Sequence, residues 1–166
     1  PVRAQGLHVD FDGGARGNPG PGAAGALLLL HTGSHTTTLA KRSTFLGAAI
    51  TNNVAEFTAL VHGLELARNF VAQSGPPTTG LLLTVTGDSQ LVCRVMLMRS
   101  ECTDAGLRPL AEQAFALVET LQAVGCELDF RHVRREFNGE ADGLANAAMD
   151  AEASTQSRTP DFAVAR

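Results

Sequence analysis

Near its start the chain reads His8-Val9-Asp10-Phe11-Asp12-Gly13-Gly14-Ala15-Arg16-Gly17-Asn18-Pro19-Gly20-Pro21-Gly22. The alternating residues before the glycines predict a strand over residues 6 to 12. Residues 13 to 22 are so rich in glycine and proline that we expect a loop in which no strand or helix continues. Asp12 is then held at a strand end, facing open space. Gly13 and Gly14 leave room and free backbone N–H groups for a large polyanion, so this stretch predicts a site for a phosphate chain and a metal.

Two alternatives stand beside this interpretation. Asp-Gly-Gly after a strand is also an ordinary turn. Asp10 competes with Asp12 for the functional role, because residues two apart share one face of a strand. We favour Asp12, since it lies where the strand gives way to glycine.

Composition bounds the kind of protein. With 166 residues the chain fits one domain, and 44% hydrophobic residues without a membrane-length apolar run indicate a soluble, globular protein with no membrane partner. The net charge of −4 argues against a strongly basic nucleic-acid binder, so any polyanion site must be local or metal-assisted. Arg131, Arg134 and Arg135 form one compact basic group, which is either a solvated surface or a phosphate contact.

The cysteines suggest a compartment. Cys93, Cys102 and Cys126 are odd in number and lack metal-ligand spacing, which indicates an intracellular, reducing environment. Cytoplasm and an organelle matrix such as that of the mitochondrion are equally compatible. The start at Pro1 fits a processed form, a trimmed chain or a domain cut from a longer protein.

Hydrophobic periodicity predicts an α/β domain over residues 1–152. The expected strands are 6–12, 23–31, 35–45, 81–86 and 126–132, and the expected helices are 53–72, 89–98, a third from Pro109 to about Gly125, and a last one around 141–149. The second and third strands should be antiparallel neighbours, and strand 81–86 should run parallel to the first. After residue 152 the pattern dissolves into Ser, Thr, Gln and Pro, so residues 153–166 are expected to form a loose tail.

Three further carboxylates each have an ordinary structural explanation. Glu56 with Asn53 fits a capping box at a helix start. Asp88 stands where an aspartate is favoured as an N-cap, and Asp142 lies in a first helical turn, where acidic residues suit the helix dipole.

Together with Asp12, however, these carboxylates all occupy strand ends and helix starts, which is where α/β proteins place working residues. Four converging carboxylates repel one another unless cations are bound. All-oxygen ligation favours Mg²⁺ or Mn²⁺ over Zn²⁺. The sequence therefore predicts a divalent-metal site.

Four motifs resemble the type 1 ribonuclease H (ribonuclease HI) family in order and spacing, over about residues 6 to 150. They are Asp12-Gly13-Gly14 with Gly17-Asn18-Pro19-Gly20-Pro21-Gly22, Thr51-Asn52-Asn53 with Glu56, Asp88-Ser89-Gln90, and Asn138 followed by Asp142-Gly143-Leu144-Ala145. The resemblance implies a mixed five-stranded sheet in the order 3-2-1-4-5, with strand 2 antiparallel and helices on both faces. It also implies an endonuclease that hydrolyses the RNA strand of RNA–DNA hybrids, leaving 5′-phosphate and 3′-hydroxyl ends.

The same resemblance implies the site residues. Two Mg²⁺ (or Mn²⁺) ions would activate a water and stabilise the leaving oxygen, and their ligands and catalytic groups would be Asp12, Glu56, Asp88 and Asp142. The candidate substrate-binding residues are Gly13, Gly14, Asn18, Thr51, Asn52, Asn53, Gln90 and Asn138. Contact with ribose 2′-hydroxyls is what distinguishes RNA from DNA.

Two features depart from the family pattern. In the bacterial branch of the family, a histidine that assists proton transfer or product release usually stands in the loop shortly before the last carboxylate. The loop from Arg134 to Ala141 has no histidine, so we expect an effect on the rate of cleavage and not on whether the protein cleaves. No basic, tryptophan-bearing handle follows the helix after Asp88, and the chain has neither Trp nor Tyr. As an isolated domain it should be a monomer that binds weakly unless another domain or a partner supplies affinity.

The alternative function is therefore a ribonuclease H-like module acting as a scaffold or RNA-binding part of a larger ribonucleoprotein or multidomain protein. Another nuclease or strand-transferase of the superfamily is disfavoured, because the Gly-Asn-Pro-Gly loop and the Thr-Asn-Asn run match the hybrid-cutting branch.

Overall fold

The structure, a computed structural model, describes residues 6–75, 80–99 and 101–158. Its strands are β1 (Gly6–Ala15), β2 (Gly20–Thr32), β3 (His35–Ile50), β4 (Leu81–Gly87), β5 (Cys126–His132) and β6 (Thr155–Arg158). Its helices are α1 (Asn52–Ser74), α2 (Gln90–Met98), α3 (Arg108–Ala123) and α4 (Gly139–Ala151), with a 3₁₀ turn, η1 (Arg135–Phe137), before α4. In this part of the chain, each helix is too short or too polar to cross a bilayer.

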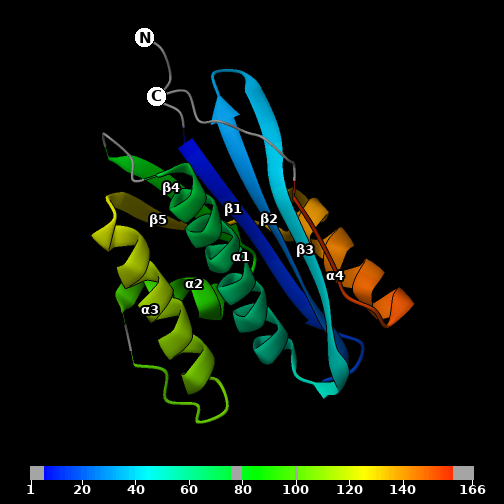
Figure 1. Cartoon of the computed structure of the whole chain (residues 1–166). Coiled ribbons are helices and arrows are strands. Elements are labelled where there is room, and N and C mark those ends of the chain that lie inside the picture. The colour runs from blue at the N-terminus through cyan, green and yellow to red at the C-terminus, as the bar shows by residue number, and fades with distance from the viewer. Residues whose placement is uncertain (1–5, 76–79, 100, 159–166) are drawn as a thin grey trace.

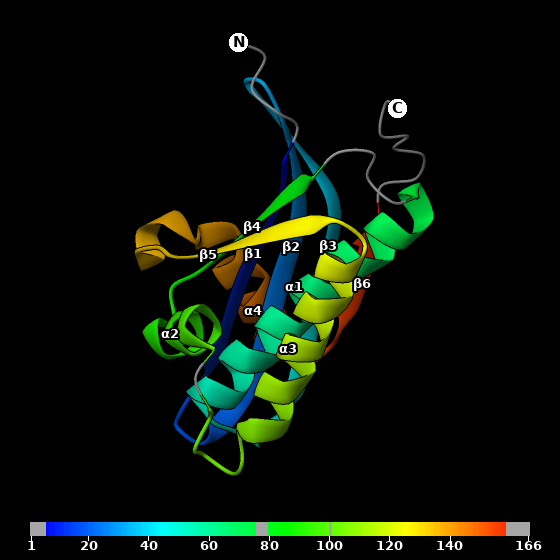
Figure 2. The ribbon, with the colours of Figure 1, turned by 90° about the vertical axis from the view of Figure 1, so that its left-hand side faces the viewer.

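One mixed sheet in the order β5-β4-β1-β2-β3-β6 organises the molecule. β1 pairs parallel with β4 and antiparallel with β2, and β4 pairs parallel with β5. α1 and α3 lie on one face of the sheet and α4 lies on the other (Figures 1 and 2). The predicted α/β class, the order of the first five strands, the antiparallel second strand and helices on both faces are confirmed.

β6 corrects two predictions: the sheet has six strands where five were expected, and the segment from residue 153, expected to be a loose tail, contains a strand. Residues 155–158 pair antiparallel with β3, with Ala40 opposite Arg158 and Ser43 opposite Thr155. The outer edge of β3 offers unpaired backbone groups, and a polar segment can complete that ladder without an apolar pattern of its own. The rest of the predicted tail, residues 159–166, lies outside the described residues.

The predicted loop over residues 13–22 is also corrected. β1 continues through Gly13 and Gly14 to Ala15, because all three pair with β2, Gly13 opposite Ala24 and Ala15 opposite Gly22. Gly13 is required for packing: a Cβ there would lie 2.1 Å from the backbone carbon of Ala55 in α1.

The pleat of β1 divides the core from the site. Its apolar side chains, Leu7, Val9 and Phe11, are buried within the main core, which also holds Phe57, Leu60 and Leu64 of α1. Its polar side chains, His8, Asp10 and Asp12, alternate with these and so lie on the opposite face. α4 covers part of that face with Ala141, Ala145, Ala148 and Met149. Asp12 therefore faces the side of the sheet on which α4 begins.

Candidate metal centre and active site

Three predicted carboxylates meet at the carboxyl end of β4. Asp12 lies near the end of β1 and is 6% exposed. Asp88 directly follows β4, which is the parallel neighbour of β1, and Glu56 reaches in from α1. One oxygen from each carboxylate lies within 4.8 Å of the others, a spacing that a shared metal ion can bridge.

Asp142 completes the set from the first turn of α4. It lines the same cavity of about 390 Å³ as Asp12, Glu56 and Asp88, although it stands outside the tight group of three. Arg135 donates from Nη2 to its Oδ1 at 3.1 Å, and Asn146 donates from Nδ2 to its Oδ2 at 3.0 Å. The fourth carboxylate is thus oriented by two partners at the wall of the cavity.

The helix N-caps are not the residues that the sequence suggested. Thr51 caps α1 by accepting a hydrogen bond from the Val54 N–H at 3.3 Å, and Ser89 caps α2 by accepting one from the Val92 N–H at 3.4 Å. Asn53 and Asp88 therefore do not serve as N-caps. Glu56 accepts a bond from the Gly13 N–H at 3.2 Å instead of closing a capping box.

Burial and mutual repulsion dominate the electrostatics of the cluster. Burial, with the charges of Glu56 and Asp88, raises the pKa of Asp12 from 3.8 to about 9. Burial, with the charge of Asp88, raises the pKa of Glu56 from 4.5 to about 8. Asp88 Oδ1 is buried with no hydrogen-bond partner among the described residues. An uncompensated oxygen and two carboxyls that resist ionisation fit a site that binds a divalent cation.

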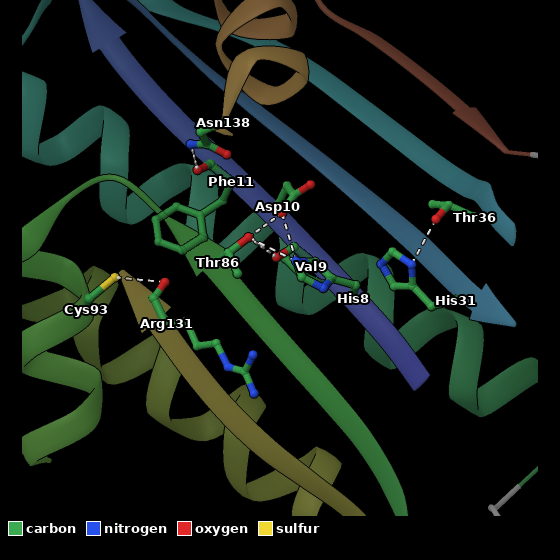
Figure 3. A network of polar contacts seen from close by, with 10 residues as sticks. All are labelled: His8, Val9, Asp10, Phe11, His31, Thr36, Thr86, Cys93, Arg131 and Asn138. Carbon is green, nitrogen blue, oxygen red and sulfur yellow. Dashed lines mark hydrogen bonds and ion pairs between the residues drawn. The ribbon is translucent and has the colours of Figure 1, made fainter. Parts of the chain in front are cut away.

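Asp10, the rival to Asp12, has a different role. Its carboxylate accepts a hydrogen bond from Thr86 Oγ1 and lies 3.0 Å from His8 Nε2 (Figure 3). Burial raises its pKa, but the contacts with His8 and Thr86 outweigh burial, and the net shift is downward. Asp10 therefore belongs to a polar bridge between β1 and β4.

Three of the eight predicted substrate-binding residues line this cavity, and five of the eight are exposed. The exposed members are Asn18, Thr51, Asn52, Asn53 and Gln90. Asn18 Oδ1 accepts from the Asn52 N–H at 3.1 Å, and Asn52 Oδ1 accepts from the Ala15 N–H at 2.9 Å. These bonds fix the 16–19 loop to the start of α1. Gly13, Gly14 and Asn52 line the cavity, and a Cβ on Gly14 would meet nothing within 4 Å, so its surface is open.

Asn138 differs from the expectation. Its side chain is 2% exposed and donates from Nδ2 to the Phe11 backbone oxygen at 2.8 Å (Figure 3). A buried amide with this partner is a structural tie between β1 and the start of α4, because it is withdrawn from the surface that a substrate reaches.

Sequence reasoning missed several residues that line the cavity, namely Arg16, Arg135, Asn146 and Met149. Asn146 carried a usable signal, since it lies four positions after Asp142 on the same helical face. The sequence marks Arg135 only as part of a basic group. His132, on β5, donates from Nε2 to the Asp88 backbone oxygen at 3.1 Å and so supports the cluster from outside.

Comparison with known proteins identifies the family. Residues 10–148 match the family model described as Reverse transcriptase-like. The chain is 35% identical over 150 residues to Ribonuclease HI of Halobacterium salinarum, covering 90% of this chain and 67% of that protein. It is 37% identical over 153 residues to the Bifunctional protein Rv2228c of Mycobacterium tuberculosis, covering 92% of this chain and only 38% of that protein.

Solved structures agree with these matches. The N-terminal RNase H domain of Rv2228c, solved as a fusion with maltose binding protein, superposes with a TM-score of 0.71 at 36% identity, covering 89% of this chain and 96% of that one. LC11-RNase H1 in complex with an RNA/DNA hybrid gives a TM-score of 0.66 at 30% identity, covering 88% and 98%. With its fold, its carboxylate cluster and these relatives, the chain belongs to the type 1 ribonuclease H family.

Proposed function

We propose that this protein is a metal-dependent endoribonuclease that hydrolyses the RNA strand of RNA–DNA hybrids and leaves 5′-phosphate and 3′-hydroxyl ends. The observation that carries the proposal is the meeting of Asp12, Glu56 and Asp88 within 4.8 Å, with Asp142 on the same cavity. A family relative has been solved in complex with an RNA/DNA hybrid, which supports the choice of substrate.

Different residues of the site would bind the metal ions, position the metal ligands and contact the substrate. Asp12, Asp88, Glu56 and Asp142 would hold two Mg²⁺ ions, with Mn²⁺ as an alternative, and such ions supply an activated water and stabilise the leaving oxygen. The Gly13 N–H donates to Glu56 and anchors its carboxylate, which would also contact a ribose 2′-hydroxyl. Arg135 and Asn146 hold Asp142 in place. The open surface at Gly14 and the exposed Thr51, Asn53 and Gln90 would contact the hybrid backbone.

A second candidate is a domain that binds hybrids or RNA within a larger protein without cutting them. It is favoured by the net charge of −4 and by the short connection between α2 and α3, which carries Glu101 and Asp104 where some family members insert a basic handle. The chain also spans 38% of the length of a bifunctional relative.

We propose that another domain or partner supplies affinity for the nucleic acid and that the isolated domain is a monomer. We also propose that the protein works in an intracellular, reducing compartment, where its three buried free cysteines stay reduced.

The test is cleavage of a hybrid labelled on its RNA strand, in Mg²⁺ or Mn²⁺, beside the same sequence as duplex RNA and duplex DNA. We expect internal cuts in the hybrid RNA strand, abolished by EDTA and by Asp12→Asn. Asp129→Asn removes an acidic side chain that is paired with Arg131 on β5 and should cut as the wild type does. Cleavage that survives Asp12→Asn would overturn the nuclease assignment, and binding without cleavage would support the second candidate.

A further inference from the structure

The turn before α4 presents an aromatic ring to solvent. Phe137, the last residue of η1, is 73% exposed, more than any other large apolar side chain in the described ranges. The other phenylalanines described there are buried or half-buried. An exposed aromatic ring lacks the hydrophobic stabilisation that burial would give. A binding partner that covers the Phe137 ring would supply that stabilisation.

The backbone that carries the ring is held in place. The Phe137 N–H donates to the Arg134 oxygen at 2.9 Å, and the Asn138 N–H donates to the Arg135 oxygen at 3.0 Å. The next side chain, Asn138, is buried and bonded to Phe11. Because η1 is fixed to β1 one residue later, the backbone of Phe137 has little ordering entropy left to lose on binding.

Positive charge flanks the ring. The side chains of Arg134 and Arg135 are 83% and 79% exposed. Arg134 lies 3.9 Å from Glu136, a distant and solvent-exposed ion pair that leaves the guanidinium available. We call Arg134, Arg135 and Phe137 the η1 surface; it joins cationic and apolar groups in a chain whose net charge is negative.

One member of the η1 surface, Arg135, also lines the carboxylate cavity. Arg135 bonds to Asp142 at 3.1 Å, and Phe137 follows two residues later in the same turn. A nucleic-acid strand with one phosphate seated among the carboxylates must leave the cavity across its rim. On the side of the cavity that Arg135 forms, the nucleotides next to that phosphate would pass the η1 surface.

We propose that Phe137 is a substrate-contacting residue whose ring packs against the sugars of the hybrid beside the cleaved phosphate, with Arg134 on a neighbouring phosphate. The proposal rests on the proposed function and names a surface that supplies affinity in a chain without a basic handle. A-form and hybrid duplexes display their sugars along a wide, shallow minor groove, which an apolar ring can reach. Removing an aromatic side chain on which a base stacks weakens nucleic-acid binding by about 5- to 150-fold.

Fluorescence tests the contact directly. The chain has no Trp, so Phe137→Trp places the sole indole on the η1 surface. In an Asp12→Asn background, which keeps the hybrid intact, we expect added hybrid to shift or quench its emission. The matched control is Val124→Trp. Val124 is 40% exposed and lies just before the amino end of β5, whereas η1 follows the carboxyl end of that strand. The emission of a tryptophan at position 124 should not change when hybrid is added.

The outcomes separate the two proposals. If a labelled hybrid binds the Phe137→Trp protein by anisotropy while the indole emission stays constant, the η1 contact is wrong and the nuclease proposal stands. If the wild-type protein neither binds nor cleaves a hybrid, both fail together.

Kinetics give an independent check. We expect Phe137→Ala to raise KM by at least about 5-fold, the lower end of that range, with kcat nearly unchanged, because the ring supports binding and lies outside the carboxylate cluster. Phe137→Leu should raise KM less than Phe137→Ala does, and Val124→Ala should leave KM unchanged. The melting temperature should stay the same, since an exposed ring contributes little to folding. An unchanged KM for Phe137→Ala would overturn the proposal.

Discussion

Asn138 donates its side-chain amide to the backbone oxygen of Phe11 at 2.8 Å, joining two residues 127 positions apart (Figure 3). Phe11 precedes Asp12 on β1, and the backbone oxygen of Asn138 accepts from the N–H of Asp142 at 3.1 Å at the start of α4. One buried residue therefore sets the position of the fourth carboxylate relative to the first.

Removing this tie should damage both fold and activity. Asn138→Ala leaves the Phe11 oxygen buried without its partner, which typically costs about 1–3 kcal/mol. We expect a lower melting temperature and a lower kcat on a hybrid, because Asp142 loses its fixed position. Asn69→Ala, at an exposed position of α1, is the control and should melt and cut normally. Full activity in Asn138→Ala would show that the tie does not position Asp142.

Without metal, the stability of the protein should fall as pH rises. The Asp12 carboxyl has a pKa of about 9 in the fold and an ordinary value of 3.8, so between these values the folded state holds a proton that the unfolded state has released. Stability then decreases with pH across that window. Melting temperatures measured in EDTA from pH 5 to pH 9 should drop, and Mg²⁺ should reverse the drop at the alkaline end.

Asp12→Asn should therefore stabilise the metal-free protein while abolishing cleavage. It removes one of the mutually repelling carboxylates, and we expect a gain of about 1–3 kcal/mol at pH 8, within the range of single substitutions. Asp129→Asn serves as the control and should change little. A metal-free Asp12→Asn protein that melts below the wild type would contradict the account of repulsion within the cluster.

The bridge between β1 and β4 should tune metal affinity. Thr86 Oγ1 bonds to Asp10, and these residues stand two positions before Asp88 and Asp12 (Figure 3). Thr86→Val keeps the shape but deletes the hydroxyl, leaving His8 as the remaining side-chain partner of Asp10. We expect about 1–2 kcal/mol of lost stability and weaker Mn²⁺ binding by calorimetry. Thr86→Ser should restore both, and equal Mn²⁺ affinity in Thr86→Val would reject the link.

Arg135 should matter for substrate and hardly at all for folding. Its ion pair with Asp142 is solvent-exposed, so Arg135→Ala should change stability by less than about 1 kcal/mol. Hybrid affinity should fall, and the slope of log affinity against log salt should become shallower by about 1, as for the loss of one phosphate contact. Arg68→Ala, at an exposed position of α1, is the control. An unaltered salt slope would show that Arg135 does not face the substrate.

Much of the site followed from local sequence. The apolar alternation over residues 126–132 predicted β5 with its observed bounds, Cys126–His132. Asp12 and Asp88 could be placed together, because parallel neighbours end at the same edge of a sheet. Strand alternation and strand ends depend on a few neighbouring residues, so the sequence alone could predict them.

The remainder depended on contacts between distant segments. β1 extends past Gly13 because its residues pair with β2 and because Gly13 packs against α1. The residues around Gly13 do not predict either of these contacts. β6 exists because β3 has an open edge. The family resemblance implied that Asn138 binds substrate, yet its side chain is directed inward to the backbone oxygen of Phe11.

The central claim is that the four carboxylates jointly hold divalent ions at the point of cleavage. Anomalous diffraction from crystals of the Mn²⁺-loaded protein with an uncleaved hybrid tests it most directly. We predict two manganese peaks about 3.5–4 Å apart, with Asp12 between them, Asp88 and Glu56 on one side and Asp142 on the other. Density for the hybrid at the cavity with no manganese within bonding distance of Asp12 would contradict the account.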